Sequence, residues 1–402
     1  MDVKIISCWF ASSYGVYTDA LRRSLESRLG HEVGIVASNC GCGDAVALHR
    51  QFQDDRCDFF VVPNIKYFKS SSPLKYRLRT QARSLVNWER ARQFHRRGDG
   101  ADVVHFQQIL NATGSVTVFH WLGMKSQAAR VVTVHELDPH QLDFPASNLA
   151  YNRADRIIVH CQEMKDSLIW LGVQGERIEV VQHGVHLEPL PDGPRDGIIF
   201  YGGHRLHSGK GLETLCEAMR RVKERLGAMT PVLRIHGHWG EATPEEGEQA
   251  ARAAGLMDDI QWLNQIKPDA AIAEYRRALL CVLPYTGSFA GYAAGLAMAH
   301  GVPVIATRRA GLPDHLGDAA RYVATNDADG LGQAILELLA DERARQDLVT
   351  RARAHAEALL GWDTVAERTL DCYGRAIAAK RRSLAERDES VIRHATSQAQ
   401  PA

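Results

Sequence analysis

A glycine-rich stretch with two cations is the part of this sequence best suited to hold phosphate. Residues 201–212 read Tyr-Gly-Gly-His-Arg-Leu-His-Ser-Gly-Lys-Gly-Leu and include Gly203 and Gly209. Glycine lets backbone amides approach phosphate oxygens closely, and a following helix points its positive end at them. Arg205 and Lys210 would neutralise negative charge on a phosphate leaving group. Because an apolar-periodic helix follows Lys210, we favour this interpretation over a surface turn with two solvated cations.

Two histidines stand near the carboxyl ends of expected strands. His135 follows the apolar run 131–134 with Glu136 beside it, and His105 lies near the end of the run 102–106. A histidine at such a position can orient a hydroxyl group or take part in proton transfer. A structural histidine is the alternative for both, and the case for His105 is the weaker one.

Short β-rich runs alternate with helical patterns along most of the chain. In the first half we expect strands at residues 3–6, 32–36, 59–62, 102–106, 130–134, 156–159 and 178–181, and a first helix at 17–29. In the second half we expect strands at 197–201, 232–236, 260–263, 281–283 and 303–306, and helices at 212–226, 245–254, 270–278, 292–300, 328–340 and 342–360. This alternation predicts an α/β fold with mainly parallel sheets that helices cover on both faces.

A proline-rich segment divides the two halves. Residues 187–197 contain three prolines and fit the interior of neither a strand nor a helix. We therefore expect a first domain at 1–187, a second at 188–361, a helix at 362–385 and a disordered polar tail at 386–402. Two such domains predict a cleft between the carboxyl ends of their sheets, where open α/β folds bind ligands.

Composition excludes several classes of protein. Lys+Arg and Asp+Glu number 48 each, so the zero net charge does not suggest nucleic acid as a partner. We find neither a signal peptide nor an apolar run of membrane-spanning length. The eight cysteines are scattered and several lie in apolar runs, which is typical of reduced thiols in a cytoplasmic protein. Cys40 and Cys42 form the one close pair, and we expect loop residues rather than metal ligands there.

The glycine-rich stretch resembles the phosphate motif of glycosyltransferase family 4, a retaining family with the GT-B fold. Further segments resemble this family in the same order, at residues 12–16, 30–33, 154–159, 182–186, 301–307 and 310–314. The segment Gly361-Trp362-Asp363 resembles the start of the family's C-terminal helix, which crosses back to the first domain. The resemblance spans about residues 1–380 and implies two Rossmann-like domains that face each other across a cleft.

The resemblance also implies roles for individual residues. Arg205 and Lys210 would stabilise the leaving diphosphate, and His135 would orient the donor sugar. The implied donor-binding residues are Gly203, Gly209, His238, Ser288, Phe289, Ala290, Gly291 and Leu296. The implied acceptor-binding residues are Ser13, Tyr14, Gly15, His105 and Glu136. No Asp-x-Asp motif stands beside a strand end, so we expect no metal and no cofactor.

The sequence departs from the family where paired glutamates are usual. This chain has Ser288 and Leu296 at the corresponding positions. In the family one glutamate holds the ribose hydroxyls and the other lies near the donor sugar, whereas a leucine accepts no hydrogen bond. The donor nucleotide is then held differently, as a deoxyribose type would be, or the donor is not a standard nucleotide sugar, or the protein binds without transferring. We favour the first because the phosphate motif is intact.

A basic stretch in the first domain is suited to an anion. Residues 66–97 contain ten lysines and arginines, with Glu89 as the one acidic residue and aromatic residues between them. The stretch is a solvated face, a site for an anionic acceptor, or a contact with a membrane surface. Nucleic acid is the least favoured partner.

Together these features predict a cytoplasmic, metal-independent, retaining glycosyltransferase of the hexosyl-transfer type, with peripheral membrane contact through residues 66–97 as one option. Its substrates would be a nucleotide-diphosphate sugar and a small-molecule or lipid-linked acceptor with a hydroxyl or amine. Epimerisation or phosphorolysis by the same fold is one alternative, although we do not find the paired carboxylates that such epimerases use. The other alternative is a non-catalytic protein that binds sugar nucleotide and supports another transferase.

Overall fold

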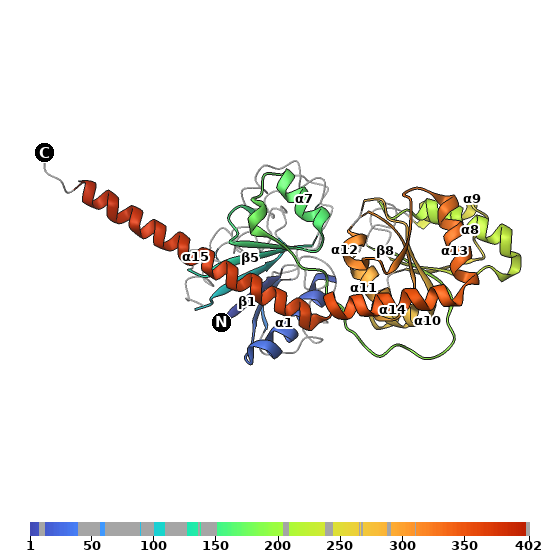
Figure 1. Ribbon diagram of the computed structural model, residues 1–402, viewed down its shortest axis with the longest axis horizontal. Coiled ribbons are helices and arrows are strands. Elements are labelled where there is room, and N and C mark those ends of the chain that lie inside the picture. The colour runs from blue at the N-terminus through green and yellow to red at the C-terminus, as the bar shows by residue number, and fades with distance from the viewer. Residues whose placement is uncertain are drawn as a thin grey trace, which may run out of the picture. The chain divides into compact units, whose positions relative to one another are not determined.

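The computed structural model describes residues 1–7, 13–38, 57–60, 89, 100–108, 127–135, 137, 151–203, 209–237, 244–264, 266, 268–287, 291–309 and 311–398. The chain divides into two compact units (Figure 1). The first comprises residues 1–160, 164–181 and 366–402, and the second comprises residues 161–163 and 182–365. The change at residues 181 and 182 lies shortly before the proline-rich segment at which we placed the domain boundary.

The first unit is built on a parallel sheet. Its seven strands lie in the order β3-β2-β1-β4-β5-β6-β7. They are β1 (Val3–Ser7), β2 (Gly34–Ser38), β3 (Cys57–Phe60), β4 (Val103–Gln107), β5 (Ala129–Val134), β6 (Arg156–Val159) and β7 (Ile178–Val180). All pairings between these strands are parallel, which confirms the expected α/β architecture. β4 is buried along its whole length, as strands covered on both faces must be.

Helix α1 (Ser13–Leu29) joins β1 to β2 and ends where the sequence predicted, at Gly30. Gly30 has a φ of 70°, the left-handed conformation that commonly follows the last turn of a helix. Ser13, Tyr14 and Gly15 lie in the first turn of α1 rather than in a loop before it. The correction arises because the helical pattern extends one turn further toward the N-terminus than its apolar periodicity indicates.

Helix α15 (Trp362–Gln398) enters the first unit from residue 366 onward. Tyr373 hydrogen-bonds His105 of β4, and Arg375 pairs with Glu179 of β7. The helix continues past residue 385, where we expected a disordered tail to begin. Residues 385–390 are exposed, and strong helix formers with opposite charges four residues apart, such as Arg382 and Glu386, maintain the helix there without packing.

The second unit contains a six-stranded parallel sheet in the order β10-β9-β8-β11-β12-β13. The strands are β8 (Asp196–Gly203), β9 (Leu233–Gly237), β10 (Ile260–Asn264), β11 (Ala278–Leu283), β12 (Val304–Thr307) and β13 (Ala320–Val323). The helices are α8 (Leu212–Leu226), α9 (Pro244–Ala253), α10 (Pro268–Arg277), α11 (Gly291–Ala299), α12 (Leu312–Leu316), α13 (Ala328–Ala340) and α14 (Glu342–Leu359). Helices α8, α9 and α13 cover one face of this sheet, and α10, α11 and α14 cover the other (Figure 1).

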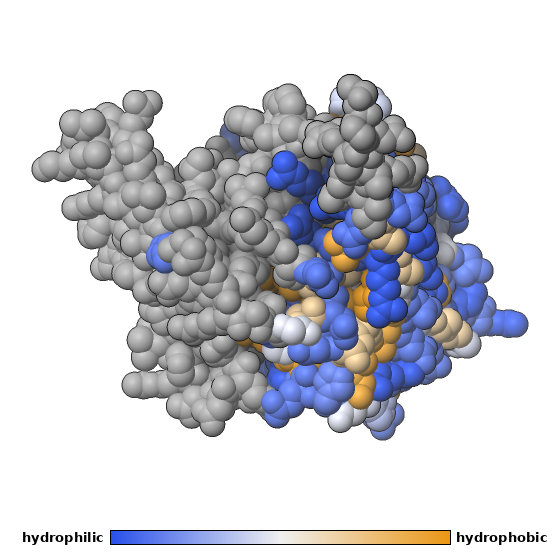
Figure 2. Space-filling model, turned by 90° about the vertical axis from the view of Figure 1, so that its left-hand side faces the viewer, coloured by the Kyte–Doolittle hydropathy of each residue, from blue (hydrophilic) through white to orange (hydrophobic). Residues whose placement is uncertain are grey.

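The described part of the chain has no helix long and apolar enough to cross a membrane. The described residues also form α7 (Gln162–Trp170) and two short 3-10 helices, at Gly175–Arg177 and Gly227–Met229. On the face drawn in Figure 2 the described residues are mostly hydrophilic, and hydrophobic residues form a narrow band between them.

Candidate functional site

In the first unit, polar side chains line one face of the sheet where its central strands end. Alternate residues of a strand share a face, so His105 and Gln107 of β4 lie together. β4 pairs with β5 so that Gln107 is opposite Thr133, and His135 continues the same alternation beyond β5. All four side chains are buried. The sequence therefore builds a polar layer into an otherwise apolar sheet.

His135 is fixed by two glutamines, Gln107 at the end of β4 and Gln108 directly after it. Its Nε2 lies 2.7 Å from Gln107 Oε1, and its backbone N–H donates to Gln108 Oε1 at 2.7 Å. Gln108 has a φ of 61°, uncommon for a residue other than glycine, and its own N–H donates to the carbonyl oxygen of Thr133 at 2.8 Å. Both the ring and the backbone of His135 are thus held in place.

His160 extends this arrangement to the next strand. It directly follows β6, and its Nε2 lies 2.9 Å from His135 Nδ1. Its Nδ1 lies 2.9 Å from the carbonyl oxygen of Val181, which can only accept. Nδ1 of His160 therefore carries a proton. The ring of Tyr17 from α1 presents an edge contact to both imidazoles, at centroid distances of 4.8 Å for His135 and 5.4 Å for His160.

His105 lies beneath the surface of the first unit, and its role toward the acceptor stays a prediction. It has no exposed surface, and its Nδ1 lies 2.7 Å from the hydroxyl of Tyr373 while its Nε2 lies 2.7 Å from Thr133 Oγ1. Burial lowers the pKa of His105 to about 3, because an imidazolium loses its hydration there. The neutral ring acts as a support between α15 and the polar layer.

In the second unit, the loop that carries Lys210 rests on the carboxyl end of β11. Thr286 donates its backbone N–H to the carbonyl oxygen of Gly209 at 2.9 Å. Gly211 has a φ of 73°, and a Cβ there would lie 2.1 Å from the carbonyl oxygen of Pro284. Since no side chain fits there, the packing of the loop by itself requires glycine at this position.

Lys210 is buried at the N-terminus of α8. It is 5% exposed, and its Nζ lies 4.1 Å from the centroid of the Tyr285 ring, within the range of a cation–π interaction. Tyr285 is fixed in turn because its hydroxyl donates to the carbonyl oxygen of Tyr201. The N-terminus of a helix carries partial positive charge. This charge and the ammonium group together favour an anion at the carboxyl edge of this sheet.

Gly291, the first residue of α11, is in contact with a buried histidine. A Cβ at this position would lie 2.2 Å from His315 Nε2. The backbone N–H of His183 donates to the same nitrogen at 3.3 Å, and Nδ1 of His315 lies 3.1 Å from the carbonyl oxygen of Gly311. Burial lowers the pKa of His315, so the ring stays neutral, with its proton on Nδ1. Gly291 is thus required by packing at the start of α11.

Leu296 belongs to the hydrophobic core of the second unit. Residues 293–299 of α11 are all buried, and Leu296 itself is 7% exposed. Its neighbour Gly295 leaves room for Val185, which a Cβ would approach to 2.4 Å. An apolar helix therefore occupies the place where the family resemblance would put a carboxylate.

Several expected site residues lie outside the described residues or have only their backbone described. Outside are Glu136, Arg205, His238, Ser288, Phe289, Ala290 and, apart from Glu89, the basic stretch 66–97. Gly203 ends β8. Among the described residues, no group of three or more His, Cys, Asp or Glu is arranged to hold a metal ion.

Sequence reasoning missed the residues that surround His135. Gln107 and Gln108 end an otherwise apolar run, and His160 follows another. Buried polar residues in such runs need partners, and this signal could have identified all three. Tyr373 gave no signal, because its contact with His105 joins residues 268 positions apart.

Two sequence families match the chain in succession. The model of Glycosyltransferase Family 4 matches residues 15–189, and the model of Glycosyl transferases group 1 matches residues 195–341. The first match lies mainly in the first unit, although its residues 161–163 and 182–189 belong to the second, and the second match lies within the second unit.

Similar curated proteins are bacterial D-inositol 3-phosphate glycosyltransferases. The one from Streptomyces avermitilis is 29% identical over 249 residues, which cover 57% of this chain and 53% of that protein. The one from Corynebacterium diphtheriae is 32% identical over 177 residues, which cover 43% of this chain and 41% of that protein. The chain therefore matches about half the length of these relatives.

Solved structures share the fold at low sequence identity. Sucrose-phosphate synthase from Thermosynechococcus elongatus has a TM-score of 0.71 and 19% identity, and the alignment covers 94% of this chain and all of that one. Anabaena HepE in complex with UDP-glucose has a TM-score of 0.69 and 14% identity, over 92% of this chain and 98% of that one.

Proposed function

This chain belongs to the glycosyltransferase family 4-like proteins of GT-B fold, and on that premise we propose that it transfers a sugar from a nucleotide-diphosphate sugar to an acceptor hydroxyl or amine, with retention at the anomeric carbon. The Lys210 site carries the proposal. A buried ammonium group at the N-terminus of α8 suits the negative charge that a departing diphosphate acquires.

In the proposed mechanism, residues of both units act on the donor. Lys210, together with Arg205, stabilises the diphosphate when the bond from its oxygen to the anomeric carbon breaks. His135 orients the donor sugar through a ring that Gln107 and His160 hold in one orientation. In this mechanism the leaving phosphate accepts the proton that the acceptor hydroxyl releases. No metal takes part.

Leu296 affects which nucleotide we expect in the donor. Because Leu296 is packed in the core of the second unit, we propose that it offers no hydrogen bond to a ribose hydroxyl. A deoxyribose donor leaves fewer hydroxyls to satisfy, and each buried one without a partner costs about 1–3 kcal/mol. A dTDP-sugar therefore belongs in any panel of donors.

The acceptor is proposed on chemical grounds. The relatives are named for D-inositol 3-phosphate, a small polyol with a phosphate group. The ten cations of residues 66–97 would suit an acceptor of this anionic class. A membrane-bound acceptor with an anionic head group would suit the same stretch.

Binding of nucleoside diphosphates tests the phosphate site directly. We expect UDP, GDP, ADP or dTDP to raise the unfolding temperature of the full chain and Lys210→Ala to abolish the shift. Lys223→Ala serves as the matched control. Lys223 lies in the last turn of α8, at the opposite end of the helix from Lys210, and pairs with Asp259. Equal shifts in both variants would mean that the phosphate assignment is wrong.

The alternative is a protein that binds sugar nucleotide without transferring the sugar. The observation that favours it is Leu296, a buried apolar residue in place of a family carboxylate. Nucleotide binding that depends on Lys210, without release of nucleoside diphosphate from any sugar donor and any acceptor, would support this alternative over transfer.

A further inference from the structure

The hydrogen bonds of His135 and His160 restrict where their protons can be. The carbonyl oxygen of Val181, 2.9 Å from His160 Nδ1, requires one proton on that nitrogen. The contact of 2.9 Å between His160 Nε2 and His135 Nδ1 requires one proton between the rings. With Gln107 Oε1 at 2.7 Å, His135 Nε2 needs a proton too. Two neutral imidazoles have two protons, and these three contacts need three, so the pair has one positive charge when the Gln107 amide has this orientation.

A half-turn of the Gln107 amide gives the neutral arrangement. Its NH2 group would then donate to His135 Nε2, and two protons would satisfy the pair. The oxygen of the amide would face His105 Nε2, which now lies 3.5 Å from the amide nitrogen. His105 would hold its single proton on Nε2 and would accept from the hydroxyl of Tyr373 on Nδ1. Every partner is satisfied in both arrangements, and they differ by one proton.

The described groups around the pair do not supply a competing charge. Tyr17 of α1, whose ring contacts both imidazoles, has a pKa raised by burial and stays protonated. Tyr373 of α15 has a pKa raised well above the usual value by burial, and the pKa of His105 in β4 is lowered to about 3. Gln107, Gln108 and Thr133 are neutral. The amide of Gln107 is therefore the described group whose orientation distinguishes the two charge states.

We propose that His135 and His160 form a single proton-binding site and that the side-chain amide of Gln107 rotates when this site takes up its proton. Each N–H of the charged pair then has an acceptor, which offsets the cost of a buried charge. Gln107 is a positioning residue, because it acts on the charge of His135 and not on the substrate. The inference deepens the proposed function, since an anionic donor beside His135 would favour the protonated pair by linkage.

Titration of the imidazole nitrogens tests this inference. The full chain is labelled with 15N-histidine, and the ring resonances of the pair are assigned with His135→Asn and His160→Asn. We expect the resonances of both histidines to move with one shared midpoint. Gln107→Glu presents only acceptor oxygens, so the midpoint should rise by about one to three pH units. Gln107→Met removes the acceptor, so the midpoint should fall.

Two controls keep the result interpretable. Gln174→Glu makes the same charge change at an exposed residue of the first unit and should leave the midpoint unchanged. Gln107→Asn keeps the amide but shortens its reach, so it should behave like Gln107→Met. Two independent midpoints, or a midpoint that is the same in wild type and Gln107→Glu, would overturn the proposal. The titration needs no substrate, so a failure of the proposed sugar transfer would not change its outcome.

Discussion

His105 couples the stability of the first unit to pH. Its pKa is about 3 in the folded protein, because burial disfavours the imidazolium, and near 6.5 in an unfolded chain. Below pH 6.5 the unfolded chain therefore binds a proton that the folded chain does not, and the folded state loses stability as the pH falls toward 3. Between pH 7.5 and 5 this loss is about 2 kcal/mol.

His105→Gln should remove this part of the pH dependence. Urea unfolding of wild type and variant at pH 7.5 and 5 measures it. We expect the stability advantage of wild type over His105→Gln to shrink by about 2 kcal/mol at the lower pH. An advantage that stays constant would show that His105 is charged in the folded state.

Gly291 is a position where packing leaves no room for a side chain. Gly291→Ala would place a methyl group 2.2 Å from the Nε2 of a fully buried His315. We expect a loss of about 1–3 kcal/mol of unfolding free energy. Gly374→Ala is the matched control: that position in α15 is exposed with nothing within 4 Å of an added Cβ. There the gain in helix propensity should stabilise the protein by up to about 1 kcal/mol.

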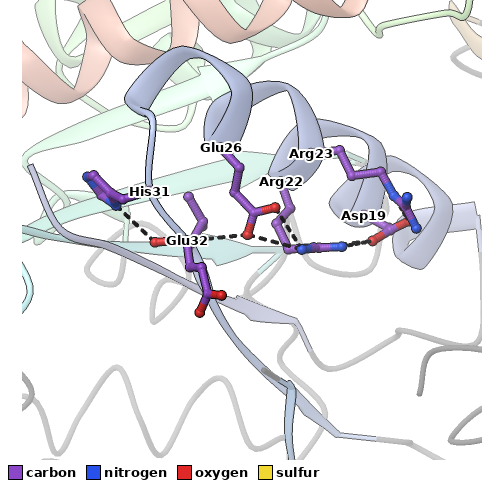
Figure 3. A network of polar contacts seen from close by, with 7 residues as sticks. Asp19, Arg22, Arg23, Glu26, His31 and Glu32 are labelled. Carbon is purple, nitrogen blue, oxygen red and sulfur yellow. Dashed lines mark hydrogen bonds and ion pairs between the residues drawn. The ribbon is translucent and has the colours of Figure 1, made fainter. Parts of the chain in front are cut away.

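At the scale of elements, α1 is attached to the sheet through charged side chains (Figure 3). Arg22 is 7% exposed and bonds both Asp19 and Glu26, with distances of 2.9 Å to each carboxylate. Glu26 also accepts the backbone N–H of Val33 at 2.9 Å, just before β2. The network therefore joins the helix to the next strand.

Removing Arg22 should be costly, because it leaves carboxylates without their buried cation. We expect Arg22→Met to lower the unfolding free energy by about 3 kcal/mol. Arg23→Met tests the same chemistry at the surface, where Arg23 is 68% exposed and pairs with Asp19, and should cost less than about 1 kcal/mol. Equal losses in chemical denaturation of the two variants would contradict a specific role for Arg22.

Helix α15 stabilises the first unit through the residues in its middle and not through those at its C-terminal end. Tyr373 and Cys372 are fully buried, and residues 385–390 are exposed. Deletion of residues 386–402 should change the melting temperature by less than about 2 °C, whereas deletion of 371–402 should lower it by at least about 10 °C. A large loss from the shorter deletion would mean that the exposed turns have a partner.

Much of the element pattern was predictable, because it depends on local sequence. The alternation of apolar runs and helical periods identified the strands of both sheets except β13, and it missed helix α7. Gly30 identified the end of α1. The end of α15 was not predictable from packing, since helix propensity alone continues it to Gln398.

At the scale of the whole molecule, the candidate site was only partly predictable. His135 and Lys210 were identified from their positions after a strand and before a helix. The residues that hold His135 in place were not predicted. Gln107 contacts His135 because of the strand register, and Tyr373 contacts His105 although the two are far apart in the sequence. Such contacts depend on how distant segments fold together, so local sequence patterns do not predict them.

The two parts of the proposed site lie in different units. Lys210, which we propose to bind the diphosphate, lies in the second unit, and His135 and His160 lie in the first. Turnover should therefore need both, and Lys210→Ala should lower it about 10²–10³-fold with the fold intact.

Release of nucleoside diphosphate from a panel of UDP-, GDP-, ADP- and dTDP-sugars, with and without a polyol-phosphate acceptor, tests the central claim most directly. We expect at least one donor to be turned over by the wild-type chain and by Lys223→Ala, and not by Lys210→Ala. No release from any donor together with no thermal shift by any nucleotide, or full activity in Lys210→Ala, would contradict the account.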